Sequence, residues 1–492
     1  MPFTLAVVVI VIAVVVALVL ILRLKRGREN HEKPIGSKIS VIQENPGLIG
    51  DQSVLMTARD TLAGGASLNW SADLEISEWQ GITVDGATLR VIALNLEHND
   101  LTGQIPPELS ELDCLEEIIL TSNTLHGEIP SELGTLANLR ILRLGENALT
   151  GQIPPELGAL VNLEVLTLSR NKLTSAIPPE LGSLASLKVL ALGGNSLTGA
   201  IPGEIGKLVS LEALILADNE LIGAIPPRLR QLDRLRELNL EDNRLAGAIP
   251  SDLGELDSLV SLNLVDNELT GWIPKELSTL ISLEELRLNS NRLTGTIPQE
   301  IRKLTKLRDL RLGGNRLTGL IPAEIGELTS LESLSLGNNR LTGAIIPELS
   351  KLVNLRRLSL RFNKLTGDIP IQLSSISSLE ELYLNGNQLT GTIPPDLGRL
   401  ANLKELDVRS NLLTGTIPPE LGDLSNLRRL FLRNNRLSGT IPSELGELRE
   451  LRRLDLRYNR LVGLIPREVR ALSQLRRLDI EGNRLSDGCP ES

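Results

Sequence analysis

Residues 139–162 read LRILRLGENALTGQIPPELGALVN, and variants of this stretch recur along most of the chain. Its asparagine, Asn147, is one of 17 that follow one another every 24 residues, from Asn99 to Asn483, without an insertion. Each is set in the pattern LxxLxLxxNxLTGxIPxxLGxLxx. A fixed period of this length indicates a solenoid, in which each repeat buries its apolar face against its neighbours.

Each part of the repeat predicts its own local structure. In LxLxxN, leucine at alternate positions predicts a short strand with one buried face, and strands of successive repeats pair in parallel about 4.8 Å apart. The asparagine amide, buried where the strand ends, has to hydrogen-bond to backbone groups and so link the repeats. The glycine of LTG predicts a positive φ, and Ile-Pro starts an extended or 3₁₀ stretch.

The pattern resembles the plant-type class of leucine-rich repeats, found in plant receptor-like kinases and polygalacturonase-inhibiting proteins. The resemblance covers residues 91–485 and departs from the class in few places, with Ser175 for a glycine, Ile346 for a proline and Asp487 at the last glycine position. It implies an α/β leucine-rich-repeat solenoid. This is a right-handed superhelix of 17 24-residue repeats with a parallel concave β-sheet and a 3₁₀ or extended convex side.

Residues 51–90 resemble the N-terminal cap of the same family, with Trp70 and Trp79 at the cap's aromatic positions. Two cysteines bracket the second tryptophan in the plant proteins, but Ser77 and Val84 stand at those places here. The cap therefore lacks the plant disulfide, and we expect the two tryptophans to hold it on the first repeat. The missing disulfide argues against a plant-like extracellular setting.

The N-terminal segment is apolar and uncharged from Phe3 to Leu22, long enough to span a bilayer as a helix. Basic residues follow it between Arg23 and Arg28, which predicts an uncleaved anchor with the repeats on the cytosolic side. A cleaved signal peptide and extracellular repeats are the alternative. We therefore expect a transmembrane signal-anchor helix at 1–22, a basic juxtamembrane linker at 23–50, a cap at 51–90, repeats at 91–485 and a tail at 486–492.

The composition points away from catalysis. The three histidines, His31, His98 and His126, are scattered, so neither a metal site nor a catalytic triad is expected. Kinase motifs are missing, and the net charge of -10 gives no reason to expect nucleic acid. We expect no enzyme activity, no cofactor and no metal.

A candidate binding surface emerges from the residues six, four, two and one places before each asparagine, which point out of the predicted sheet. Early repeats offer small or acidic residues at these places, such as Ala191, Gly193, Glu237 and Glu241, but from the twelfth repeat on the same columns hold many basic and aromatic residues. The candidate ligand-binding residues are Arg357, Arg361, Phe362, Tyr383, Arg409, Arg429, Phe431, Arg433, Arg453, Arg457 and Tyr458. Arginine and aromatic residues are common interface anchors, which favours an acidic ligand across repeats 12 to 16. The alternative is that these arginines pair with Asp407, Asp455 and Asp479 and only solvate the end of the solenoid.

These observations favour a membrane-tethered recognition protein that binds a peptide or protein ligand on its concave face and signals through a partner. A structural or adhesive scaffold is one alternative, and an extracellular inhibitor of a secreted enzyme is another. The resemblance offers no C-terminal cap after Asn483, so self-association at that uncapped end is a further expectation.

Overall fold

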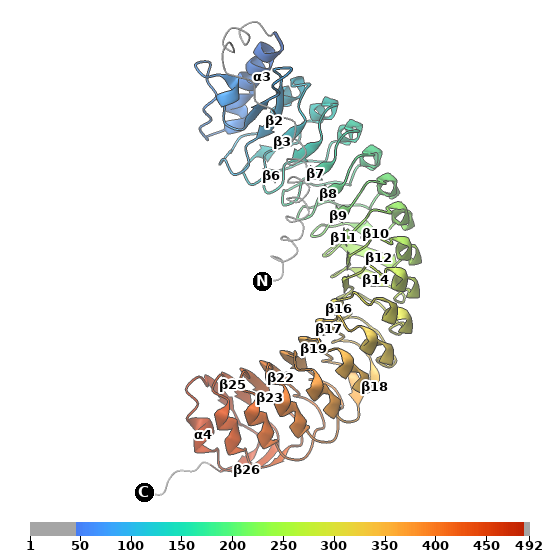
Figure 1. Ribbon diagram of the computed structural model, residues 1–492, viewed down its shortest axis with the longest axis vertical. Coiled ribbons are helices and arrows are strands. Elements are labelled where there is room, and N and C mark those ends of the chain that lie inside the picture. Colours follow the sequence, from blue (N-terminus) through green and yellow to red (C-terminus); the bar gives the residue numbers. More distant parts are fainter. Residues whose placement is uncertain (1–45, 487–492) are drawn as a thin grey trace. The chain divides into compact units, whose positions relative to one another are not determined.

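The computed structural model describes residues 46–486 (Figure 1). The chain forms two compact units, the first from residues up to 172 together with 184–191, the second from residues 173–183 together with those from 192 onward. The predicted anchor at residues 3–22, nearly all of the predicted linker and Asp487 lie outside the described residues. Among residues 46–486 no helix is long and apolar enough to cross a bilayer.

The LxL segments form short strands whose central leucine or isoleucine is buried, except in the last repeat, where Leu478 is partly exposed. Strands of successive repeats pair in parallel at a register of one repeat, for example Leu286 with Leu310, which confirms the predicted sheet. In the first unit the strands are β2 (Val91–Asn95), β3 (Glu117–Ile119), β5 (Ile141–Arg143), β7 (Val165–Thr167) and β8 (Val189–Ala191). In the second unit they are β9 (Ala213–Ile215), β11 (Glu237–Asn239), β13 (Ser261–Asn263), β15 (Glu285–Arg287), β16 (Asp309–Arg311), β17 (Ser333–Ser335), β19 (Arg357–Ser359), β21 (Glu381–Tyr383), β22 (Glu405–Asp407), β23 (Arg429–Phe431), β25 (Arg453–Asp455) and β27 (Arg477–Asp479).

The other side of each unit carries 3₁₀ helices, as the Ile-Pro motif predicts (Figure 1). An extended residue, most often proline, precedes most of them, and the leucine or isoleucine inside each is buried. The glycine after that leucine allows close stacking, since a Cβ on Gly254 would lie 2.4 Å from the carbonyl oxygen of Glu276. The helices are η2 (Pro107–Glu111), η3 (Ser131–Thr135), η4 (Pro155–Ala159), η5 (Pro179–Ser183), η6 (Gly203–Lys207), η7 (Pro227–Gln231), η8 (Ser251–Glu255), η9 (Lys275–Thr279), η10 (Gln299–Lys303), η11 (Ala323–Glu327), η12 (Pro347–Lys351), η13 (Ile371–Ser375), η14 (Pro395–Arg399), η15 (Pro419–Asp423) and η16 (Ser443–Glu447), with the α-helix α4 (Arg467–Arg470) in the last repeat.

Short strands also form around the LTG segments, which the sequence pattern did not predict as strands. They pair in parallel within small separate sheets. The members are β4 (His126–Gly127) with β6 (Ala148–Leu149), β10 (Ile222–Gly223) with β12 (Arg244–Ala248) and β14 (Glu268–Thr270), β18 (Thr342–Ala344) with β20 (Lys364–Thr366), and β24 (Ser438–Gly439) with β26 (Arg460–Gly463) and β28 (Arg484–Leu485). The glycine there has a positive φ, for example 77° at Gly271, as predicted.

Ser175 occupies one of these glycine positions and has a φ of 70°. A side chain in the left-handed region costs about 1 kcal/mol or more. Ser175→Gly should therefore raise the free energy of unfolding by about 1 kcal/mol, measured by urea denaturation of the full chain. Ser183→Gly, in η5, is the control and should lower it. A destabilised Ser175→Gly variant would contradict the assignment of strain to this residue.

The repeating asparagines form the predicted hydrogen-bond ladder. The Oδ1 atom of Asn291 accepts the backbone N–H of Leu269 in the preceding repeat at 3.0 Å. Its Nδ2 group donates to the carbonyls of Leu264 at 2.8 Å and Leu288 at 3.3 Å. The same bonds recur in both units from Asn123 onward, so each of these asparagines closes its own strand and ties it to the repeat before.

The N-terminal end of the first unit consists of helix α3 (Pro46–Ala63), the short helix η1 (Ile76–Glu78) and strand β1 (Ile82–Val84), which pairs antiparallel with β2. Trp70 and Trp79 are buried and stacked, with ring centroids 5.9 Å apart. Asp51 of α3 accepts hydrogen bonds from the guanidinium of Arg90 and from the backbone N–H of Val91. These contacts hold the segment on the first repeat without a disulfide.

Candidate ligand-binding surface

The eleven candidate residues all lie in the second unit, on or just after strands β19 to β25, which are orange to red in Figure 1. Because the central leucine of each strand points into the core, the residues on either side of it point outward. We call these eleven residues the basic strip. The structure separates them into members that serve the fold and members that remain open to a ligand.

Phe431 lies at the centre of the basic strip but is only 5% exposed. The guanidinium groups of Arg409 and Arg453 lie over its ring, each 5.1 Å from the ring centroid. Cation–π contacts of this kind are stabilising, and more so when they are partly desolvated. Phe431 therefore positions two arginines and offers a ligand little surface of its own.

Phe362 and Tyr458 each stand one place before a repeat asparagine, and each is about half exposed. Both have a positive φ, 52° and 56°, and each ring lies beside a glycine of the next repeat, Gly386 and Gly482 respectively. Arg433 lies over the ring of Tyr458 at 5.3 Å. These two rings are the aromatic groups of the basic strip that a ligand can reach.

Most arginines of the basic strip are neutralised by carboxylates of their own or a neighbouring repeat. Three of these partners are Asp407, Asp455 and Asp479, as the alternative interpretation expected. The ion pairs are Arg357 with Glu381 at 2.6 Å, Arg409 with Asp407 at 3.0 Å, Arg429 with Glu405, Arg453 with Asp479 at 3.6 Å and Arg457 with Asp455 at 2.6 Å. Burial raises the pKa of Asp407 to about 6 even though Arg409 is its partner. Burial also acts to raise the pKa of Asp455, but the hydrogen bonds from Arg457 outweigh it and lower that pKa.

Tyr383 is held in place by acidic neighbours rather than left free. Its hydroxyl donates toward Glu405 at 3.0 Å and Glu381 at 3.2 Å. Burial, followed by the two carboxylates, raises the pKa of Tyr383. The hydroxyl of Tyr383 therefore links two carboxylates and fixes its own ring, so Tyr383 stabilises the surface and offers a ligand little contact area.

Two arginines of the basic strip, Arg361 and Arg433, make no ion pair within residues 46–486. Arg361 is exposed. The Nε atom of Arg433 is buried and lacks a hydrogen-bond partner. Asn385, between Arg361 and Arg409 in the same column, also keeps a buried Oδ1 atom without a partner. Asn385 is not among the residues predicted from the sequence, because its side chain is neither charged nor aromatic, although it occupies the same column.

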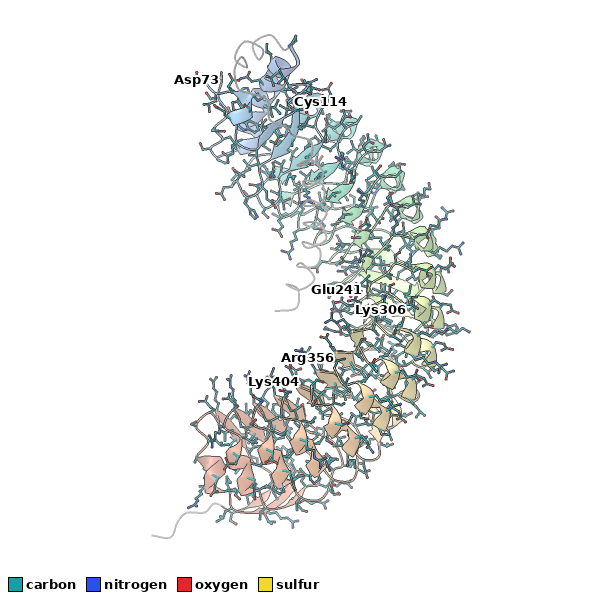
Figure 2. The ribbon with its side chains drawn as sticks, viewed as in Figure 1. Asp73, Cys114, Glu241, Lys306, Arg356 and Lys404 are labelled. Atoms are coloured by element: carbon teal, nitrogen blue, oxygen red, sulfur yellow. The ribbon has the colours of Figure 1, made fainter. Side chains whose placement is uncertain are left out.

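A further column lies seven places before each asparagine, where acidic and basic residues alternate from Glu284 to Lys404. Glu380, for example, pairs with Arg356 at 3.5 Å and with Lys404 at 2.5 Å, and Figure 2 shows these two cations on the strand side of their unit. The alternation then stops, and Arg428, Arg452 and Arg476 follow in three successive repeats. We call these three residues the arginine run. They are exposed, and no carboxylate of the described chain forms an ion pair with them.

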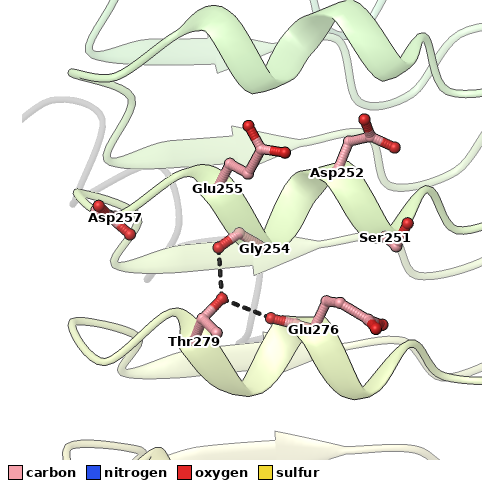
Figure 3. A pocket seen from close by; sticks show the side chains of 7 residues that line it. All are labelled: Ser251, Asp252, Gly254, Glu255, Asp257, Glu276 and Thr279. Atoms are coloured by element: carbon pink, nitrogen blue, oxygen red, sulfur yellow. Dashed lines mark hydrogen bonds between the residues drawn. The ribbon is translucent and has the colours of Figure 1, made fainter.

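A shallow hollow on the 3₁₀ side of the second unit shows no comparable features. It lies between η8 and η9 and is lined by Ser251, Asp252, Gly254, Glu255, Asp257, Glu276 and Thr279 (Figure 3). The hydroxyl of Thr279 donates to the carbonyls of Gly254 and Glu276, so its hydrogen-bonding needs are met inside the fold. In the described part of the chain, no group of three or more His, Cys, Asp or Glu residues could hold a metal ion.

Family models for leucine-rich repeats match much of the chain. A model described as a leucine-rich repeat region matches residues 267–385, and a leucine-rich repeat model matches residues 162–221 and 425–485. A two-copy model matches residues 377–419, and a single-repeat model matches residues 90–112, 138–160 and 234–256.

The chain is similar in sequence or structure to three plant receptor proteins. The LRR receptor-like serine/threonine-protein kinase FEI 2 of Arabidopsis thaliana is 38% identical over 84 residues, which are 16% of this chain and 14% of the length of that kinase. The plant peptide hormone receptor RGFR1, solved in complex with RGF2, is 34% identical with a TM-score of 0.74, over 79% of this chain and 70% of that one. The LRR ectodomain of the Arabidopsis thaliana membrane receptor kinase GASSHO1/SCHENGEN3, in complex with CASPARIAN STRIP INTEGRITY FACTOR 2, is 35% identical with a TM-score of 0.67, over 89% and 62%.

The prediction of a single-pass membrane protein with cytosolic repeats is contradicted by these similarities. The receptor kinase GASSHO1/SCHENGEN3 structure to which the chain is similar is an ectodomain, which argues against repeats on the cytosolic side. One argument for the cytosol was the cap without cysteines. That argument fails physically because stacked Trp70 and Trp79 and the Asp51–Arg90 ion pair replace the disulfide, so its absence says nothing about the redox compartment.

Proposed function

Because the chain belongs to the leucine-rich-repeat family, in its plant-type class, we propose that it is a recognition protein that acts by binding. Its ligand is an acidic peptide or protein, held on the strand surface of repeats 12 to 16, and a partner protein transmits the signal. The complex of the similar plant peptide hormone receptor RGFR1 with RGF2 supports a ligand of this class.

The arginine run is the observation that carries the proposal: Arg428 and Arg452 lie in repeats 15 and 16, and Arg476 extends the run into repeat 17. Like charges on neighbouring strands repel one another, and the same column avoids this from Glu284 to Lys404 by alternating acids and bases. Arg428, Arg452 and Arg476 lack that compensation, so a partner has to supply the negative charge if they are to be stabilised. Arg433 and Tyr458 lie in the same repeats. They add a guanidinium that stacks on a half-exposed ring and has no ion-pair partner in residues 46–486.

Arg428→Glu restores the alternation of charges and should therefore separate binding from stability. We expect a slightly higher melting temperature, because the new carboxylate stands between Lys404 and Arg452. We expect about tenfold weaker binding of a fluorescent oligo-glutamate peptide in an anisotropy titration, with the loss shrinking as salt is added. Arg356→Glu is the matched control in the alternating part of the column. It should lower the melting temperature, since it breaks the pair with Glu380, and leave binding unchanged.

Arg433→Ala and Tyr458→Ala test the basic strip itself, and each should also weaken peptide binding by about tenfold. Phe431→Ala and Arg457→Ala are less informative, because the first empties a buried position and the second leaves the buried Asp455 without its partner. Unchanged affinity in Arg428→Glu, Arg433→Ala and Tyr458→Ala together would place the ligand elsewhere.

A further inference from the structure

Arg143 ends strand β5 in the first unit, four places before Asn147, and is partly buried on the strand surface. Its Nε atom and one of its Nη atoms are buried without a hydrogen-bond partner. Glu97 and Glu117 act on the guanidinium only through space, with neither a hydrogen bond nor an ion pair, and burial lowers the pKa of Arg143. A buried cation without a partner is costly for a fold.

Arginines at the equivalent position of the second unit are compensated. Arg287 also stands four places before its asparagine and pairs with Asp309 at 2.8 Å and Glu285 at 3.2 Å. Arg311, in the next repeat, pairs with the same Asp309 at 2.9 Å. Arg287 and Arg311 therefore each form an ion pair with a carboxylate, whereas Arg143 forms none within residues 46–486.

Thr121 provides a second unpaired donor on the same surface. Its Oγ1 atom is buried and lacks a partner, like the guanidinium nitrogens of Arg143. Ile119 pairs in register with Arg143, and Thr121 follows two residues later, so both side chains lie on one face of neighbouring strands. Thr167 of β7 is in register with Arg143 on its other side. A forked cation and a hydroxyl are suited to the two oxygens of one carboxylate.

We propose that Arg143 and Thr121 form a binding subsite for a ligand carboxylate on the strand surface of the first unit. The ligand group carries a single negative charge, because Glu97 and Glu117 already make the surroundings of Arg143 negative and disfavour a dianion such as phosphate. The subsite lies in a different unit from the basic strip and does not depend on the function proposed for it.

Melting temperatures of the full chain in acetate and in chloride, at equal pH and ionic strength, test the subsite. The melting temperature of the wild type minus that of Arg143→Met should be larger in acetate than in chloride, and phosphate should increase this difference less than acetate does. Arg143→Met should melt higher than the wild type in chloride, because it removes the uncompensated charge, and should not respond to acetate. Thr121→Val should keep its fold and lose most of the acetate response.

Arg287→Met is the matched control at the same place in its repeat. It should melt lower than the wild type, because it removes a compensated arginine, and should still respond to acetate. The proposal is overturned if Arg143→Met melts lower than the wild type in chloride, or if its response to acetate equals that of the wild type. It is also overturned if phosphate increases the difference in melting temperature, wild type minus Arg143→Met, more than acetate does.

Discussion

Replacing Asn291 with alanine should lower the free energy of unfolding by about 2–3 kcal/mol. The substitution removes the acceptor of the Leu269 N–H group and the donor to the carbonyls of Leu264 and Leu288, all in the buried interior. A buried polar backbone group left without a partner costs about 1–3 kcal/mol. The effect exceeds that of an ordinary surface substitution because the asparagine serves two repeats at once.

Arg292→Ala, at the adjacent residue, is the control for Asn291→Ala. Arg292 is half exposed and pairs with Glu268 at 3.0 Å, an arrangement that contributes about 0.5 kcal/mol or less. Urea denaturation followed by circular dichroism should give clearly different midpoints for the two variants. Equal midpoints would show that the asparagine ladder adds little to stability.

Glu237→Gln should stabilise the protein by about 3 kcal/mol at pH 8 and have little effect at pH 5. Glu237 begins strand β11, is 8% exposed, and keeps a buried Oε2 atom without a partner. Burial, followed by repulsion from Glu285, raises the pKa of Glu237 from 4.5 to about 7. Each unit of pKa difference between the folded and unfolded states corresponds to about 1.4 kcal/mol.

The sign of this pH dependence follows from the raised pKa. Between pH 4.5 and 7 the folded protein keeps the proton on Glu237 while the unfolded chain loses it, so stability falls as the pH rises through this range. Glutamine stays neutral at every pH and removes the loss. Free energies of unfolding measured from pH 5 to pH 8 should diverge between wild type and Glu237→Gln. Parallel curves would contradict the assignment.

The sequence predicted the strands, the 3₁₀ helices and the ladder because each depends on contacts that repeat identically every 24 residues. Asn291 and Gly254 have the same surroundings as their counterparts, so one copy describes all of them. The short strands around LTG were missed because their pairing depends on how far the backbone at Thr342 lies from that at Lys364, which a glycine-containing turn motif does not specify.

The sequence showed which side chains of the candidate surface point outward. It did not show how deeply each one is buried or which carboxylate pairs with it. Alternation along a strand shows that Phe431 points outward, but it cannot show that the long side chains of Arg409 and Arg453 fold over the ring. The pairing of Arg457 with Asp455, two residues earlier, and the lack of a partner for Arg143 depend in the same way on side-chain conformation. The arginine run is visible in the sequence, but its meaning depends on the ion pairs formed by the preceding repeats.

The unbroken asparagine ladder also bears on how such a chain can change in evolution. Each rung joins one repeat only to the next, so the bonds at Asn291 do not depend on how many repeats stand on either side. Unequal recombination that adds or removes one whole repeat leaves every remaining rung intact, whereas a shift of one residue would misalign the strands that meet there. Selection can thus lengthen the solenoid or change its recognition surface by duplicating whole repeats, without any change to the residues of the buried core.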